Sequence, residues 1–158
     1  MSGILDRPLM RRLAQGVARV TRGMTLGVRG IALDPGGRVC LVRHTYVDGW
    51  YLPGGGVEPG ETVAAAMIRE FREETGIRIA TEASLRLQGL FLNRRDGGRD
   101  HIAVFAVGEV ASDAAKDPDR EIAECRYFPL DGLPPGTTAG TRARLREFAL
   151  GAAPDAEW

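Results

Sequence analysis

The chain has 158 residues, a length typical of one domain. Its 21 basic residues balance its 21 acidic ones, so charge gives no reason to expect binding to nucleic acid or to an anionic membrane. Two cysteines, Cys40 and Cys125, are too few for a disulfide framework or a zinc site, and Cys40 lies in an apolar run that suits a buried thiol. With no signal-peptide core or membrane-spanning run in view, we expect a cytoplasmic protein.

The first predicted element is a helix near the start of the chain. Asp6-Arg7-Pro8 suits a helix start, and an apolar stripe at helical spacing follows at Leu9, Leu13, Val17 and Val20. We therefore expect residues 1–23 to form a helical extension and residues 24–158 to form the main domain. The stripe favours packing on that domain or on a second copy, in a homodimer, over lying on a membrane surface.

The remaining elements alternate between strands and helices. Residues 24–33 and 38–45 read as strands joined by the turn Asp34-Pro35-Gly36-Gly37, which is a hairpin signal. A second hairpin is expected over residues 84–95 and 101–110, then a short strand over 124–129 and a final helix over 141–150. Mixed strands around two or three helices predict an α/β sandwich.

The segment between the two hairpins carries the strongest pattern in the chain. Residues 55–77 read GGVEPGETVAAAMIREFREETGI. Seven positions have fixed spacing: Gly55, Glu61, Arg69, Glu70, Glu73, Glu74 and Gly76. At average residue usage, the chance of such a match is about 10⁻⁸ per starting position. The whole pattern is therefore far more specific than the charged stretch REFREE alone.

Helical geometry places the acidic residues of this segment together. For a helix over residues 62–75, Glu70, Glu73 and Glu74 fall within an arc of about 100°. Carboxylates this close repel one another, and a hard cation such as Mg²⁺, or Mn²⁺, would relieve the repulsion. The alternative is a surface charge cluster stabilised by Arg69 and Arg72.

The segment resembles the Nudix box, and the flanking strands extend the resemblance over residues 27–133. The resemblance implies an α/β/α sandwich in which a mixed sheet lies between helices and the box forms a loop-helix-loop. One position departs from the family pattern, because Phe71 stands where an aliphatic residue is usual. Since Phe71 lies on the apolar arc of the helix, we expect it to affect core packing and not metal binding.

The resemblance also implies roles for the box residues. It implies that the carbonyl of Gly55 joins Glu70, Glu73 and Glu74 in a metal site, and that these three glutamates carry the catalysis. It further implies a structural pair between Glu61 and Arg69. Gly76 is well placed to end the helix, because glycine adopts the left-handed backbone of a C-terminal cap.

Candidates for a general base lie outside the box as well as within it. The acidic loop over residues 117–124 contains Glu121 and Glu124, and either is a candidate to accept a proton from water. Glu73 is the rival within the box, and a solvated loop carboxylate is the structural alternative for both loop residues.

Five residues are candidates for substrate binding. Charged or hydrogen-bonding side chains suit phosphates, and aromatic rings suit a nucleobase. The set is Arg43, His44, Tyr46, Trp50 and Arg94. For Trp50 the alternative is packing against the sheet, for His44 an ordinary hydrogen-bonded strand histidine, and for Arg94 a solvated turn.

Taken together, the resemblance implies a Mg²⁺-dependent pyrophosphohydrolase that cleaves the diphosphate linkage of a small-molecule nucleotide. Leu92 stands where ADP-ribose-cleaving subfamilies tend to have proline, and residues 126–134 look like the segment found in members that cleave nucleoside triphosphates. Nucleoside triphosphates are therefore favoured, with nucleotide sugars and ADP-ribose next. The alternatives are a Nudix-fold nucleotide sensor without turnover and an isoprenoid diphosphate isomerase, whose reactive-cysteine signature is missing.

Overall fold

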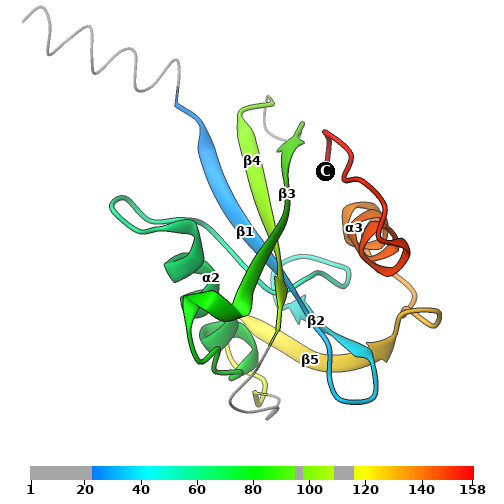
Figure 1. Ribbon diagram of the computed structural model, residues 1–158. Helices are drawn as coiled ribbons and strands as arrows, with labels where there is room; N and C mark the ends of the chain where they lie inside the picture. The colour runs from blue at the N-terminus through cyan, green and yellow to red at the C-terminus, as the bar shows by residue number, and fades with distance from the viewer. Residues whose placement is uncertain (1–22, 95–97, 109–115) are drawn as a thin grey trace, which may run out of the picture.

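The computed structural model describes residues 23–94, 98–108 and 116–158 (Figure 1). Apart from its last residue, the extension predicted for residues 1–23 lies outside this part and stays a prediction. The elements, in chain order, are β1 (Thr25–Ala32), β2 (Arg38–His44), α2 (Val63–Thr75), the 3-10 turn η1 (Glu82–Ser84), β3 (Leu85–Asn93), β4 (Asp100–Val107), β5 (Ile122–Pro129) and α3 (Ala139–Leu150). None of the helices described is long and apolar enough to cross a membrane.

The strands form two small sheets. In the larger one, the order is β1-β4-β3, with β1 parallel to β4 and β3 antiparallel to it. In the smaller one, β2 pairs with β5 in antiparallel orientation. The larger sheet is therefore mixed, as expected, and the predicted β3–β4 hairpin is confirmed.

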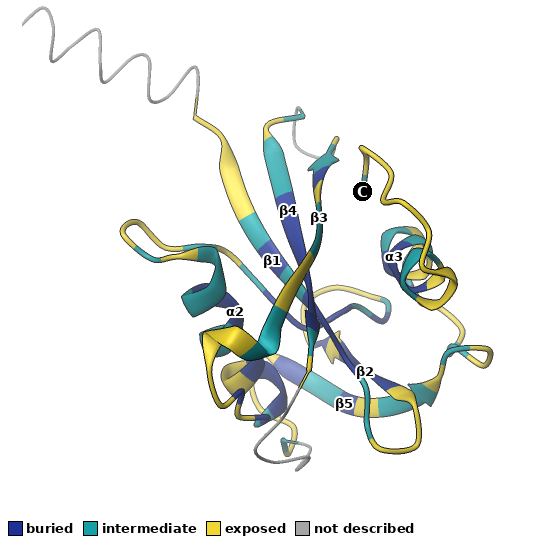
Figure 2. Ribbon diagram, viewed as in Figure 1, coloured by how far each residue is buried: buried dark blue, intermediate teal, exposed yellow. Residues whose placement is uncertain are grey.

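Helices α2 and α3 lie on opposite sides of the three-stranded sheet, which gives the α/β/α sandwich (Figure 1). One buried cluster joins Met67 and Phe71 of α2 to the sheet, and a second joins Leu145 of α3 to the other side. Figure 2 shows that burial is concentrated where the strands cross between the helices. Cys40 and Cys125 are both buried free thiols, and their sulfurs lie 3.5 Å apart in the α2-side core.

The first predicted hairpin is only half right. The turn forms as expected, since the Asp34 amide donates to the Arg38 carbonyl at 2.9 Å. Beyond it, however, β1 and β2 diverge into different sheets. The reason is that the loop before α2 occupies the edge of β1 that β2 would need: the amides of β1 residues Val28 and Gly30 donate to the carbonyls of Gly55 and Pro53 at 2.8 and 2.9 Å.

Local signals place both ends of α2 as predicted. The Thr62 hydroxyl accepts a hydrogen bond from the Ala65 amide at 3.0 Å, which caps the first turn. At the other end Gly76 has φ of 74° and donates its amide to the Arg72 carbonyl. The sequence between these caps is amphipathic, so α2 presents its apolar side to the sheet and its acidic side to the loop before it.

Phe71 is buried, and its position depends on a glycine in β1. A Cβ at Gly30 would lie 2.0 Å from Cε2 of the Phe71 ring, far inside van der Waals contact. Phe71 itself is 0% exposed and belongs to the α2-side core. The larger side chain in the box is therefore accommodated by the missing side chain on the strand beneath it.

We expect Gly30→Ala to lower the free energy of unfolding by about 1–3 kcal/mol, because a methyl group would overpack this contact. The loss should be smaller in a chain that also carries Phe71→Leu, since leucine leaves the edge of the ring site open. Urea unfolding of the two single variants, the double variant and the parent protein measures this coupling. Strictly additive losses would contradict a direct contact between the two positions.

Candidate active site

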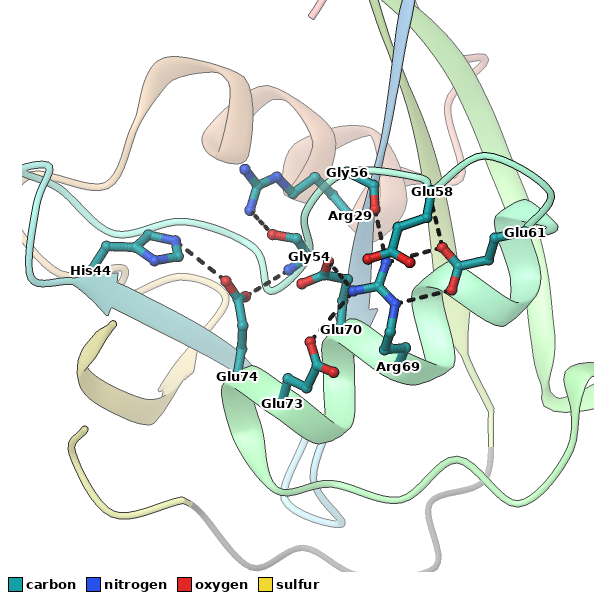
Figure 3. Close-up of polar contacts among 10 residues, drawn as sticks. All are labelled: Arg29, His44, Gly54, Gly56, Glu58, Glu61, Arg69, Glu70, Glu73 and Glu74. Atoms are coloured by element: carbon teal, nitrogen blue, oxygen red, sulfur yellow. Dashed lines mark hydrogen bonds and ion pairs between the residues drawn. The ribbon is translucent and has the colours of Figure 1, made fainter. Parts of the chain in front are cut away.

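Helix α2 carries Glu70, Glu73 and Glu74 on the side that faces the loop over residues 54–56 (Figure 3). The three carboxyl groups differ in burial. Glu74 is 6% exposed and Glu70 is partly buried, whereas the Glu73 side chain is about half exposed. The exposure of the three carboxyl groups therefore ranges from buried to about half exposed within little more than one turn of helix.

Glu74 lies deepest and connects α2 to the loop. Its Oε2 accepts a hydrogen bond from the Gly54 amide at 2.8 Å, and its Oε1 lies 3.7 Å from Nε2 of His44. Burial raises the pKa of Glu74 to about 7, and burial lowers the pKa of His44. Both shifts favour the neutral form, so burial disfavours an ion pair between these two side chains.

Arg69 links the other carboxylates to the loop. Its guanidinium donates to both oxygens of Glu61 at 3.0 Å, to Glu70 at 2.6 Å and to the Gly56 carbonyl at 2.9 Å. The Glu61–Arg69 pair implied by the resemblance is therefore present. Burial raises the pKa of Glu70, and the Arg69 hydrogen bond works against that shift. Arg69 thus supplies the positive charge that neutralises Glu61 and Glu70.

The glycines of the loop are required by close approach. A Cβ at Gly55 would lie 2.6 Å from the Glu70 carboxylate, and a Cβ at Gly54, which has φ of 144°, would lie 2.0 Å from the Val28 carbonyl oxygen. The Gly55 carbonyl, proposed as a metal ligand, already accepts the Val28 amide at 2.8 Å. It keeps its second lone pair, since a carbonyl oxygen accepts two hydrogen bonds or ligands.

The donors present suit a hard divalent cation, because they are carboxylate and carbonyl oxygens on a single side of the helix. Within residues 23–94, 98–108 and 116–158, no three His, Cys, Asp or Glu side chains are gathered closely enough to form a cation site. Glu70 turns to Arg69 and Glu74 turns to Gly54. Side-chain rotation about χ angles would be needed for these groups to converge on one ion.

The loop that contains Glu121 is held against the end of α2. The amides of Glu121 and Ile122 donate to Asp119 Oδ1 at 2.8 and 2.7 Å, and these bonds with Lys116 hold the pKa of Asp119 well below its usual range. Lys116 pairs with Asp119 and donates to the Glu73 carbonyl at 2.5 Å. Burial raises the pKa of Tyr46 and of Glu74, and the Glu121 charge adds to both shifts.

Glu124, the other loop candidate, is engaged elsewhere. It faces Arg43 across the β2–β5 pair and forms ion pairs with Arg43 and with Arg126. The Arg43 guanidinium also lies 5.9 Å from the centre of the Trp50 ring. Glu124, expected as a candidate base, and Arg43, expected as a candidate phosphate ligand, are therefore paired with each other.

The remaining substrate-binding candidates separate into two groups. Tyr46 is 69% exposed and its ring lies 5.1 Å from that of His44, so both remain close to Glu74. Trp50 is 9% exposed and packs edge-on against Phe128, which favours the packing alternative for it. The structure does not bring Arg94 to the box, because its guanidinium pairs with Glu157 near the end of the chain.

Comparison with known proteins agrees with the geometry. A family model described as the NUDIX domain matches residues 23–148. The chain belongs to the Nudix hydrolase family. It is 31% identical over 142 residues to the human 8-oxo-dGDP phosphatase NUDT18, covering 83% of this chain and 40% of that one. It is 38% identical over 76 residues to the human diphosphoinositol polyphosphate phosphohydrolase 2, covering 48% of this chain and 41% of that one.

A solved structure shows the same Nudix fold. The MutT protein from Methanosarcina mazei Go1 matches with a TM-score of 0.67 at 23% identity, covering 81% of this chain and 94% of that one. The chain spans about two fifths of the length of both curated Nudix relatives. The family is thus established over the domain that carries the box, while the names of its members span several substrates.

Sequence reasoning missed three residues of this Nudix site. Arg29 of β1 donates to two carbonyls of the loop before α2, and Asp119 and Lys116 hold the Glu121 loop. Asp119 carried a weak local signal, because an aspartate followed by free amides favours an Asx turn. Arg29 carried none, since a single arginine in a strand has no pattern that distinguishes it.

The raised pKa of Glu74 predicts a pH-dependent stability in chelator-treated protein. Its ordinary value is 4.5 and its folded value is about 7, so the folded state binds more protons than the unfolded state between these values. The free energy of unfolding should therefore fall as pH rises from about 4.5 to 7, by on the order of 3 kcal/mol at most. Glu74→Gln, which stays neutral, should remove this fall and should be more stable than the parent above pH 7.

Denaturant unfolding between pH 5 and pH 8.5 in the presence of a chelator measures the difference. His44, which contacts Glu74, has a lowered pKa and contributes a rise in stability with pH in both proteins, so the test compares the two profiles with each other. The exposed Glu82 provides the matched control, and Glu82→Gln should leave the profile unchanged. Parallel profiles for the parent and Glu74→Gln would show that the Glu74 proton does not contribute.

Proposed function

We propose that this chain is a metal-dependent pyrophosphohydrolase that cleaves the diphosphate linkage of a nucleoside diphosphate derivative. The supporting observation is the group of three box carboxylates on α2, which faces a glycine loop that holds Glu74 through the Gly54 amide. The names of the curated relatives, a nucleoside diphosphate phosphatase and a diphosphoinositol polyphosphate phosphohydrolase, support hydrolysis of phosphorylated substrates. Among nucleotides we favour triphosphates, with nucleotide sugars and ADP-ribose next.

The residues that would hold Mg²⁺ or Mn²⁺ are Glu70, Glu73 and Glu74 with the Gly55 carbonyl. When bound, such an ion supplies positive charge that offsets the charge developing on the phosphate oxygens and favours deprotonation of water. Without the ion, the hydrogen bond from the Gly54 amide sets the position of the Glu74 carboxylate, and the contact with Arg69 sets that of Glu70.

The chain's own residues supply the proton acceptor and the nucleotide contacts. Water attacks one phosphorus of the diphosphate bridge, the bridging P–O bond breaks, and the water proton passes to a carboxylate. Outside the box we favour Glu121 as the acceptor, because its loop is tied to α2 whereas Glu124 is paired with Arg43. Exposed Tyr46, beside His44, offers a surface on which a nucleobase can stack.

A panel of nucleoside triphosphates, nucleotide sugars and ADP-ribose, incubated with Mg²⁺ or Mn²⁺, tests the proposal. We expect turnover of one class, with release of phosphate or pyrophosphate from a triphosphate, or of a nucleoside monophosphate and a sugar phosphate from a nucleotide sugar or ADP-ribose. Both Glu73→Gln and Glu74→Gln should lower kcat/KM by about 100-fold or more. Chelation should abolish turnover, and Glu82→Gln should leave it unchanged. Saturable binding of a nucleotide without turnover of any compound would instead identify a sensor and would refute the hydrolase.

A further inference from the structure

Positive charge near the box carboxylates is mostly neutralised by other residues of the chain. In the described part of the molecule, ion pairs join Arg69 to Glu61 and Glu70, Arg43 to Glu124, and Lys116 to Asp119. A substrate that carries several phosphates still requires cationic partners, because buried or clustered phosphate charges are stabilised by guanidinium or metal ions. These pairs leave few cations at the site available to a phosphate chain.

Arg29 differs from these paired cations, and it also differs from the exposed Arg72 and Arg120 because hydrogen bonds hold it against the loop before α2. It forms no ion pair with a carboxylate, and its Nη1 donates instead to the carbonyls of Leu52 and Gly54 at 3.0 and 2.6 Å. Its guanidinium also lies 6.0 Å from the centre of the Tyr51 ring. One nitrogen is therefore fixed by two neutral acceptors, so the side chain is oriented without an ion pair to a described carboxylate.

Two of the Arg29 nitrogens keep their hydrogen-bonding capacity. Within the described residues, Nε and Nη2 have no hydrogen-bond partner, and neither is sealed from solvent. Figure 3 shows the guanidinium beside the carbonyl of Gly54, the residue whose amide contacts Glu74. The guanidinium charge acts on Glu70, Glu74 and His44: burial dominates their pKa shifts, and this charge lowers the pKa of each.

We infer that Arg29 binds a non-bridging phosphate oxygen of the substrate through its free nitrogens, while its fixed nitrogen holds the loop before α2. This inference rests on the proposed function and names a residue for it. A planar guanidinium offers parallel donors to phosphate, a geometry that lysine does not match. Arg29 takes the role that we expected of Arg43 and Arg94, which are paired with Glu124 and Glu157.

The test separates phosphate binding from support of the loop. Calorimetry with Mg²⁺ measures Kd for two probes: imidodiphosphate, which consists of phosphates alone, and an α,β-imido nucleoside triphosphate. In Arg29→Met both values of Kd should rise by about 10- to 100-fold, the loss expected for a charge-assisted hydrogen bond. Arg29→Lys should fall between the parent and Arg29→Met, and Arg78→Met, which removes the same charge from an exposed position, should bind as the parent does.

The outcomes distinguish this inference from the proposed function. Unchanged Kd for both probes in Arg29→Met, with a lower Tm or kcat, would show that Arg29 only supports the loop and would overturn the inference, whether or not the parent turns over. A parent protein that binds both probes but hydrolyses no nucleotide would refute the hydrolase, while the Kd comparison would still decide the role of Arg29. A parent that binds neither probe and hydrolyses nothing would refute both.

Discussion

The structure depends on the approach of one loop to the edge of one strand. The loop before α2 runs along β1 close enough for the amides of Val28 and Gly30 to reach its carbonyls, and only glycine fits at Gly54 and Gly55. This contact turns β2 away into the second sheet and sets the loop against the acidic side of α2. It also places the Gly54 amide where it can donate a hydrogen bond to the Glu74 carboxylate. The fold and the carboxylate site therefore follow from the same constraint.

Elements with strong local signals were predictable from the sequence. The bounds of α2 follow from the Thr62 cap, the apolar period and Gly76, and the β3–β4 pair follows from two strand-like runs around a short turn. The pairing of β1 was not predictable in this way. The turn at Asp34 specifies a reversal of the chain, but which strand then occupies the edge of β1 is decided by a competition with residues far along the sequence.

The same distinction applies to the candidate site. The box glutamates were predictable because a helical period and fixed spacing place them together, whereas residues outside the box depend on cross-strand register. Arg43 lies opposite Glu124 only because β2 and β5 pair at that register, and Trp50 is buried against Phe128 of β5 within the α3-side core. Arg29 has its role through carbonyls more than twenty residues away, so no window of sequence around it contains the signal.

The contact between Gly30 and Phe71 has a consequence for engineering this domain. A consensus approach treats each column of an alignment separately and would replace Phe71 with the usual aliphatic residue to gain stability. Here that change would leave unfilled volume above a glycine, because the two positions are matched in size across forty residues of chain. Redesign of this core must therefore change strand and helix together, and libraries that vary one position alone will sample mostly cavities and collisions.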